Sequence, residues 1–355
     1  MKPWLSSLAA LALLAALAPA RAEPDAGALY QAKCAACHGG DRLGAIGPAL
    51  LPDNLGRLGV AGAEKVIRSG REATQMPAFG SELDEASIKA LAALVYTKPA
   101  TTPVWGEKEI AASRVLTPAP AVDKPVFAAD PLNLFVVVES GDHHVSILDG
   151  DTFTPMHRFA SRFALHGGPK FTHDGRYVFF GSRDGWVTKF DLWTLKVVAE
   201  VRAGVNARNI ALSKDAKHLA VANYLPNTLV ILSAADLSVE KIFDVVDRKG
   251  QASRVSAVYQ APQRDRFIAA LKDVPEIWEI GASPNSPPVY TGLVHSYEEG
   301  MVEGLPSSQG LFALRRIETS ENMLVTRPSI WFDESALETK MRSAVYQGSA
   351  RSSVE

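Results

Sequence analysis

Cysteine is nearly missing from this chain, with two residues in 355. At most one disulfide can form, which excludes a disulfide-rich secreted scaffold. After the N-terminal segment, no stretch reaches the roughly 18 to 20 apolar residues of a membrane helix. No basic stripe or Lys/Arg cluster favours nucleic acid, and the formal net charge is only -2. We therefore expect a chain of about two domains with no membrane span and no nucleic-acid partner.

The first 22 residues have the pattern of a secretory signal peptide. Lys2 precedes an apolar stretch over residues 5–17, and the Ala-Arg-Ala sequence at 20–22 supplies a small-residue cleavage pattern. The apolar stretch is too short to span a bilayer. The sequence therefore predicts a soluble exported protein that loses residues 1–22.

Both cysteines lie in one segment, CAACH at 34–38, which is the attachment pattern of c-type haem. Two thiols three positions apart on a helical turn reach the two vinyl groups of one porphyrin, while the adjacent imidazole binds the iron. The alternative is a thioredoxin-like disulfide, but that fold places its pair after a strand, and residues 26–34 are predicted helical. We therefore predict one covalent haem c on Cys34 and Cys37, with His38 as an iron ligand.

A low-spin electron carrier needs a second axial ligand, and Met76 is the candidate. Pro77 disfavours helix at the preceding residue, so Met76 is expected in an extended loop that can approach the iron. A lone Met is more often a core residue, but this one lies in a polar loop 38 residues after His38. A final helix, with Asp84 as its N-cap and an end near residue 97, is predicted to follow.

The second half of the chain repeats. Prolines in and beside residues 99–124 predict an extended linker rather than packed core. Beyond it, β-rich runs recur every 42 residues, and a fourth copy starts at Phe267. Repeats of about 40 to 45 residues are typical of β-propeller blades, so we predict a propeller over 125–318 and an atypical tail over 319–355. Three sets of positions carry the period: Phe135, Tyr177 and Leu219; Asp149, Asp191 and Ser233; and Phe153, Leu195 and Leu237.

One repeat phase also aligns polar residues that could face the central channel. Arg forks bind carboxylates bidentately and neutral imidazole binds iron, so this set suits a metal-bearing ligand with several carboxylates. The turns of Arg183 and Lys272 are expected on the same face. The plainer interpretation is that each histidine forms a structural hydrogen bond and each turn is solvated. The aligned residues are His166, Arg208, Arg254 and His295, separated by 42, 46 and 41 positions.

Two resemblances follow from these segments. Residues 25–97 resemble a small class I cytochrome c, a family in which a proline such as Pro48 directs its carbonyl to the proximal histidine. The segments "ALHGGPKFTHDGRYVFFGSRDGWVTKFDLW", "VNARNIALS" and "LKDVPEIW" resemble the haem d1 domain of the cytochrome cd1 family. The resemblance implies a multidomain fold: a small all-α cytochrome c domain (23–98), then an all-β propeller of an eight-bladed family.

The cytochrome cd1 resemblance also implies roles for single residues. His166 matches the proximal haem d1 ligand, and Arg208 and Arg254, with Arg183 beside them, match basic residues around the macrocycle's carboxylates. His295 matches a distal catalytic histidine. Nitrite reductase in this family uses two distal histidines, whereas no histidine follows His295. The resemblance is therefore strongest to the dihydro-haem d1 dehydrogenase branch, the NirN type.

That branch implies a periplasmic oxidoreductase of haem d1 biosynthesis and denitrification. A propionate of noncovalent dihydro-haem d1 is oxidised to acrylate, and the electrons leave through the covalent haem c. The implied partners are a redox protein, haem d1 assembly proteins and nitrite reductase. Because the repeat fades after residue 318, we expect a C-terminally shortened, incomplete propeller. A propeller shortened in this way is expected to lose activity. Two alternatives stay open: a plain electron-transfer cytochrome c and a nitrite reductase relative.

Overall fold

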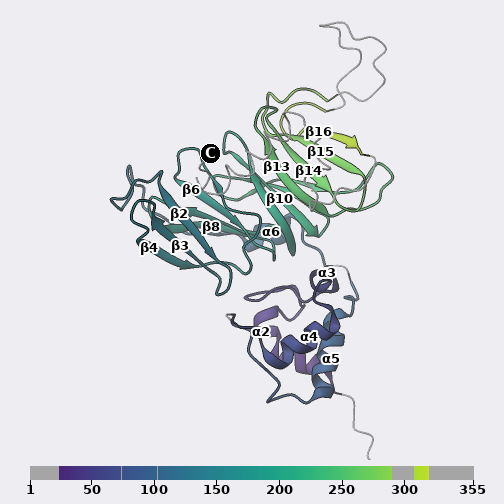
Figure 1. Cartoon of the computed structure of the whole chain (residues 1–355). Coiled ribbons are helices and arrows are strands. Elements are labelled where there is room, and N and C mark those ends of the chain that lie inside the picture. Colours follow the sequence, from purple (N-terminus) through teal and green to yellow (C-terminus); the bar gives the residue numbers. More distant parts are fainter. Residues whose placement is uncertain (1–23, 73, 102, 290–307, 320–355) are drawn as a thin grey trace, which may run out of the picture.

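The computed structural model describes residues 24–72, 74–101, 103–289 and 308–319. It has a helical N-terminal domain followed by antiparallel sheets (Figure 1). The predicted signal peptide, His295 and the tail beyond residue 319 lie outside the described residues. Among the helices that are described, none has the length and apolar character to cross a bilayer.

The N-terminal domain is built on the packing of its first helix against its last. Asp84 caps the last helix, and its carboxylate accepts the amide of Ser87 at 2.9 Å, so the predicted N-cap is confirmed. Tyr30 of the first helix is buried with Leu91 and Val95 of the last in one apolar cluster. The helices are α1 Ala26–Lys33, α2 Ala35–His38, α3 Pro52–Leu55, α4 Gly59–Ser69 and α5 Glu85–Tyr96.

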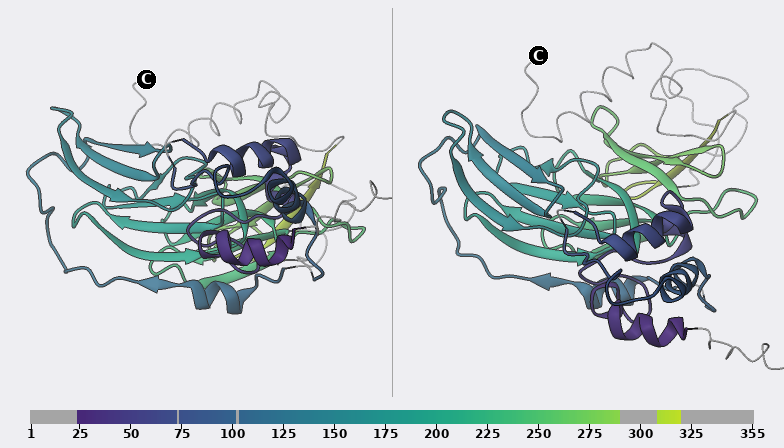
Figure 2. Two further views of the ribbon diagram at one scale, coloured as in Figure 1. Left: turned by 90° about the horizontal axis from the view of Figure 1, so that it is seen from below. Right: turned by 60° about the horizontal axis from the view of Figure 1, so that its bottom comes forward.

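The described residues after the linker form four antiparallel sheets in which each strand pairs with the next. Apolar clusters join the first sheet to the second, the second to the third and the third to the fourth. Figure 2 shows the sheets side by side in chain order, which is the predicted arrangement of blades. The sheets are β2 Leu134–Glu139, β3 His144–Asp149 and β4 Pro155–Ala160; β5 Lys170–Phe171, β6 Tyr177–Gly181, β7 Trp186–Asp191 and β8 Lys196–Arg202; β9 Asn206–Leu212, β10 His218–Leu225, β11 Thr228–Ser233 and β12 Val239–Asp244; β13 Val255–Ala261, β14 Arg266–Leu271, β15 Glu276–Gly281 and β16 Leu314–Glu318.

The 42-residue period corresponds to a repeated turn, which lies between β3 and β4, between β7 and β8, and between β11 and β12. Phe153, Leu195 and Leu237 have φ angles of 56°, 56° and 60°. The amide of Phe153 donates to the carbonyl of Asp149 at 2.9 Å, and that of Leu237 to Ser233 at 2.8 Å. A left-handed conformation is uncommon for residues other than glycine. Its recurrence at one phase confirms that the repeat is structural.

The prediction of an extended connector is wrong for the central part of residues 99–124. There, Glu107–Ser113 form α6, and Val115–Leu116 form β1, which adds an edge strand to β8. Ile110 is fully buried in the apolar cluster between the second and third sheets. The prolines lie before and after this stretch, so they mark its flanks, while the apolar residues between them pack.

Replacing Ile110 by Ala should therefore destabilise the propeller. Removing a fully buried isoleucine side chain leaves a cavity, and we expect the free energy of unfolding to fall by about 2–5 kcal/mol. Urea unfolding followed by tryptophan fluorescence measures this loss. Val104→Ala is the matched control because Val104 is 74% exposed. Equal stabilities of the two variants would contradict the packing of α6.

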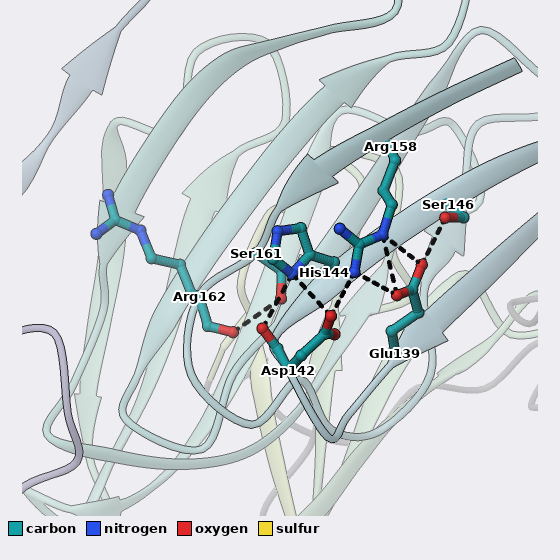
Figure 3. Close-up of polar contacts among 7 residues, drawn as sticks. All are labelled: Glu139, Asp142, His144, Ser146, Arg158, Ser161 and Arg162. Carbon is teal, nitrogen blue, oxygen red and sulfur yellow. Dashed lines mark hydrogen bonds and ion pairs between the residues drawn. The ribbon is translucent and has the colours of Figure 1, made fainter. Parts of the chain in front are cut away.

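An ion network ties the strands of the first sheet together (Figure 3). Arg158 of β4 donates to both oxygens of Glu139 in β2, with Nε 3.1 Å from Oε1 and Nη2 2.7 Å from Oε2, and it also contacts Asp142. Ser146 of β3 donates to Glu139 at 2.5 Å. The hydrogen bonds from Arg158 and then Ser146 hold the pKa of Glu139 at about 2. Because its charges are mutually paired, the network acts as a structural cross-link.

Candidate functional site

The CAACH segment begins where α1 ends. Cys34 caps the C-terminus of α1 and also begins α2. The amides of Cys37 and His38 both donate to the carbonyl of Cys34, at 3.1 and 2.9 Å. Both thiols are free, so the structure does not adopt the disulfide alternative. One helical turn carries both cysteines and the histidine, which is the spacing that covalent haem attachment needs.

His38 is held from one side by the backbone. Its Nδ1 lies 2.8 Å from the carbonyl oxygen of Pro48, so the predicted hydrogen bond is present. Since a carbonyl only accepts, Nδ1 carries the proton and Nε2 keeps the lone pair for a metal. A Cβ on Gly47 would lie 2.9 Å from the His38 ring, so only glycine permits this approach. Burial lowers the pKa of His38, which keeps the imidazole neutral.

Met76 lies half-buried in the loop between α4 and α5, outside helix and strand. The loop is fixed to the end of α4 by backbone hydrogen bonds, from the Arg71 amide to the Met76 carbonyl at 3.1 Å and from Phe79 to Ile67 at 3.0 Å. Gly70 has a φ of +69°, and a Cβ there would lie 2.8 Å from the Met76 carbonyl oxygen. These contacts fix the backbone of Met76 beside the end of α4. Iron ligation by Met76 itself stays a prediction.

Replacing Met76 by Ala tests that ligation. We expect the haem c to lose its low-spin spectrum and its reduction potential to fall, because a thioether ligand raises the potential of haem iron. Visible spectra of both oxidation states and a potentiometric titration measure the two effects. Met156→Ala, in β4 of the propeller, is the control and should change neither. A low-spin spectrum and an unaltered potential in the Met76 variant would assign the ligand elsewhere.

The three described residues of the shared repeat phase lie at the first strands of successive blades. His166 precedes β5, Arg208 lies in β9, and Arg254 directly precedes β13. Each of these strands is the edge of its sheet, and β9 contacts both β5 and β13. This is the arrangement expected of innermost propeller strands.

His166 and Arg208 form a close pair. His166 Nδ1 lies 2.8 Å from the carbonyl oxygen of Arg208, while Arg208 Nη1 lies 2.7 Å from His166 Nε2. The carbonyl accepts from Nδ1, so Nε2 is the unprotonated nitrogen. Burial and then the charge of Arg208 lower the pKa of His166 to about 4. The imidazole is neutral at pH 7, and its Nε2 lone pair is available to a metal that displaces the guanidinium.

Further guanidiniums converge on this pair. Arg183 lies in the turn between β6 and β7, and its backbone carbonyl accepts a hydrogen bond from the amide of Ala207, the residue before Arg208, at 3.1 Å. Burial, then Arg208 and also Arg57 of the cytochrome domain, lower the pKa of Arg183. In the described part of the chain neither Arg183 nor Arg208 pairs with a carboxylate. Unpaired, half-buried arginines form a site that favours anionic groups.

Arg254 is in a different electrostatic state. Its Nε lies 2.9 Å from Asp273 Oδ2, so a carboxylate already neutralises its charge. Its guanidinium lies 5.5 Å from the centre of the Tyr224 ring, and Lys272 Nζ lies 3.3 Å from the Tyr224 hydroxyl. Sequence reasoning grouped Arg254 with Arg208, but of these two arginines Arg208 is the one that has no carboxylate partner in the described part of the chain.

Sequence reasoning also missed Tyr224, Asp273 and Arg57. Asp273 follows Lys272 in the same turn, so the Lys-Asp pair was a usable signal. Arg57 gave none, because it lies in the other domain and reaches the site only through the docking of the two domains.

Two family models match successive, separate regions of the chain. The cytochrome D1 heme domain matches residues 129–296, and the model for cytochrome C oxidase, cbb3-type, subunit III matches residues 22–95. The two matches cover the two structural parts of the chain and include the residues described above.

Curated relatives match across both regions. Dihydro-heme d1 dehydrogenase of Pseudomonas aeruginosa is 56% identical over 286 residues, which are 80% of this chain and 58% of that protein. Nitrite reductase of Stutzerimonas stutzeri is 28% identical over 298 residues, which are 77% of this chain and 52% of that protein. Protein NirF of Pseudomonas aeruginosa is 32% identical over 162 residues, which are 45% of this chain and 41% of that protein.

A solved structure gives the same result for the fold. Dihydro-heme d1 dehydrogenase NirN in complex with DHE superposes with a TM-score of 0.72 at 51% identity and covers 83% of this chain and 58% of that one. The matched residues span 58% of dihydro-heme d1 dehydrogenase, 52% of the nitrite reductase and 41% of NirF, so the chain covers about half the length of these relatives. Residues 22–95 thus match a c-type cytochrome model and residues 129–296 match the cytochrome D1 heme domain, which is the order of domains in the cytochrome cd1 family that the sequence resembles.

Proposed function

We propose that this protein oxidises dihydro-haem d1 in the periplasm. One observation carries the proposal: each domain holds a histidine, buried His38 and half-buried His166, whose Nδ1 donates to a backbone carbonyl and whose Nε2 therefore keeps the lone pair that iron would bind. In the propeller this histidine lies beside Arg183 and Arg208, which have no carboxylate partner among the described residues. An iron macrocycle with several carboxylates matches both features.

In the cytochrome domain, Cys34 and Cys37 would hold the porphyrin, and His38 and Met76 would ligate its iron. The covalent haem supplies one-electron redox chemistry, so that the two electrons of the oxidation can leave singly. The chain's own contribution is orientation: the Pro48 carbonyl fixes the plane of the His38 ring, and the glycine before Pro48 lets that loop approach.

In the propeller, His166 would ligate the iron of the substrate, and Arg208 and Arg183 would bind its carboxylates. Oxidation of the propionate to acrylate breaks two C–H bonds and forms one C=C bond, and two protons and two electrons leave. His295, which lies outside the described residues, is proposed to take one of the protons, which suits an imidazole near neutral pH. Arg254 would orient Tyr224 and Asp273 at the edge of the site.

The relatives NirF and nitrite reductase support a context in denitrification. Within it we propose a redox protein as electron acceptor, and haem d1 assembly proteins and nitrite reductase as partners. Export to the periplasm rests on the sequence of residues 1–22.

Reconstitution with dihydro-haem d1 tests the proposal. The haem c-loaded chain should bind the macrocycle, convert it to haem d1 and reduce its own haem c, all followed by visible spectroscopy and extraction of the product. The chain with nitrite and a reductant is the comparison, and nitric oxide release there would favour the nitrite reductase alternative. An unchanged haem c spectrum and unconverted macrocycle would leave a plain electron carrier.

A further inference from the structure

Arg202, at the end of β8, connects three parts of the chain. It is 5% exposed. Its Nε donates to the carbonyl of Asp184 at 2.8 Å, inside the second blade. Its Nη2 donates to the carbonyl of Leu43, in the cytochrome domain. Its guanidinium lies 4.7 Å from the centre of the Trp105 ring, in the linker. We propose that Arg202 is an interdomain latch, a positioning residue that fixes the cytochrome domain on the propeller and so sets the separation of the two haem sites.

The linker reinforces the latch from the other side. Trp105 Nε1 donates to the carbonyl of Arg202 at 2.8 Å, and the amide of Arg202 donates to Ser113 Oγ at 2.9 Å. Both linker residues therefore bind the backbone of the residue whose side chain reaches the cytochrome domain. The linker segment that was expected to be extended is what holds this arginine in place.

Charge favours the docked position. Burial lowers the pKa of Arg202, while Asp184 and then Asp41 of the cytochrome domain raise it. Asp184 is 2% exposed and lies on the propeller side, and Asp41 approaches from the cytochrome side. A buried guanidinium requires hydrogen-bond acceptors around its fork, and the Leu43 carbonyl supplies one of them from outside the propeller.

An apolar contact lies beside the latch. Ala49 and Leu51 of the cytochrome domain are fully buried with Val205 of the propeller, and Leu225 packs on the same cluster. Figures 1 and 2 show the cytochrome domain against the ends of the sheets from different directions. The apolar cluster excludes water, and the directional bonds of Arg202 fix the orientation that the small cluster alone would leave loose.

This interface lies between the two candidate sites. Ala49 directly follows Pro48, whose carbonyl binds His38, and Leu43 lies five residues before Pro48. On the propeller side, Val205 directly precedes β9, which carries Arg208 three residues later. The rate of electron tunnelling falls steeply with distance. Loss of the Arg202 contacts should therefore slow electron transfer between the two haem sites without changing the residues of either site. The slower electron transfer rests on the proposed function, whereas the docking of the cytochrome domain by Arg202 does not.

Arg202→Gln is the decisive variant, and small-angle X-ray scattering of the haem c-loaded chain is the first measurement. We expect an increased maximum dimension, an unchanged haem c spectrum and potential, and, with dihydro-haem d1 bound, at least tenfold slower reduction of haem c. Arg202→Lys keeps the charge without the fork and should be intermediate. Arg248→Gln, at a side chain that is 56% exposed in the loop between β12 and β13, is the matched control and should behave as the unaltered protein.

If the Arg202→Gln variant does not fold, Trp105→Phe takes its place, because it removes one bond to Arg202 and keeps a ring beside the guanidinium. Scattering curves that match the unaltered protein in the folded variant would overturn the latch. So would an unaltered rate of haem c reduction despite an enlarged dimension. An enlarged dimension in a chain that binds no macrocycle would retain the latch and reject the proposed function.

Discussion

Exchange of both Cys34 and Cys37 for serine should yield a chain with no covalent haem. Serine hydroxyls do not form thioethers with the vinyl groups, and the two thiols are the chain's full complement of cysteine. Treatment with alkaline pyridine should give a haem spectrum for the unaltered protein and none for the double variant after acid extraction. The intact mass of the double variant should be lower than that of the unaltered protein by the mass of one haem, in addition to the change that the two substitutions cause.

The single variants sharpen this test. Cys34 is half-buried at the end of α1, and Cys37 is exposed. Either single serine variant should retain haem through one thioether at lower yield. The double variant retaining haem after extraction would contradict attachment at this segment, and with it the one-electron part of the proposed function.

The second large effect is expected at Arg208. Replacing it by Gln should weaken binding of dihydro-haem d1 by about 10- to 150-fold, the usual value of a hydrogen bond to a charged group. Gln retains the backbone carbonyl that accepts from His166, so ring orientation is preserved and the loss measures the guanidinium. Titration of the macrocycle into the haem c-loaded chain, followed by visible absorption, gives the affinity.

The matched control removes a neighbouring arginine without changing the net charge of the site. The double variant Arg254→Gln, Asp273→Asn deletes one positive and one negative charge that pair with each other. Its affinity should stay within a few-fold of the unaltered protein. If the Arg208→Gln variant and the Arg254→Gln, Asp273→Asn variant lost affinity equally, the ion pair of Arg254 with Asp273 would not distinguish the role of Arg254 from that of Arg208.

Local chemistry explains what could be predicted from the sequence. The Asp84 cap depends on residues within one helical turn, and the haem attachment pattern depends on five consecutive positions. The 42-residue period was detectable because the first three blades repeat the same turn, down to the left-handed residue at Phe153, Leu195 and Leu237.

Long-range packing explains what could not be predicted. Prolines around residues 99–124 gave a local signal of extension, whereas the burial of Ile110 depends on two sheets that form far along the chain. The pairing of Arg254 with Asp273 spans a hairpin, and the approach of Arg57 depends on how two domains dock. His295 and the iron ligation by Met76 stay predictions.

The backbone hydrogen bonds of His38 and His166 have a consequence for how these sites tolerate mutation. In both cases the acceptor is a main-chain oxygen, of Pro48 and of Arg208, and no substitution of those side chains deletes it. The direction of the Nε2 lone pair of each imidazole is therefore set by the backbone conformation. Random mutagenesis should lose the rings' alignment only through changes that move the main chain itself.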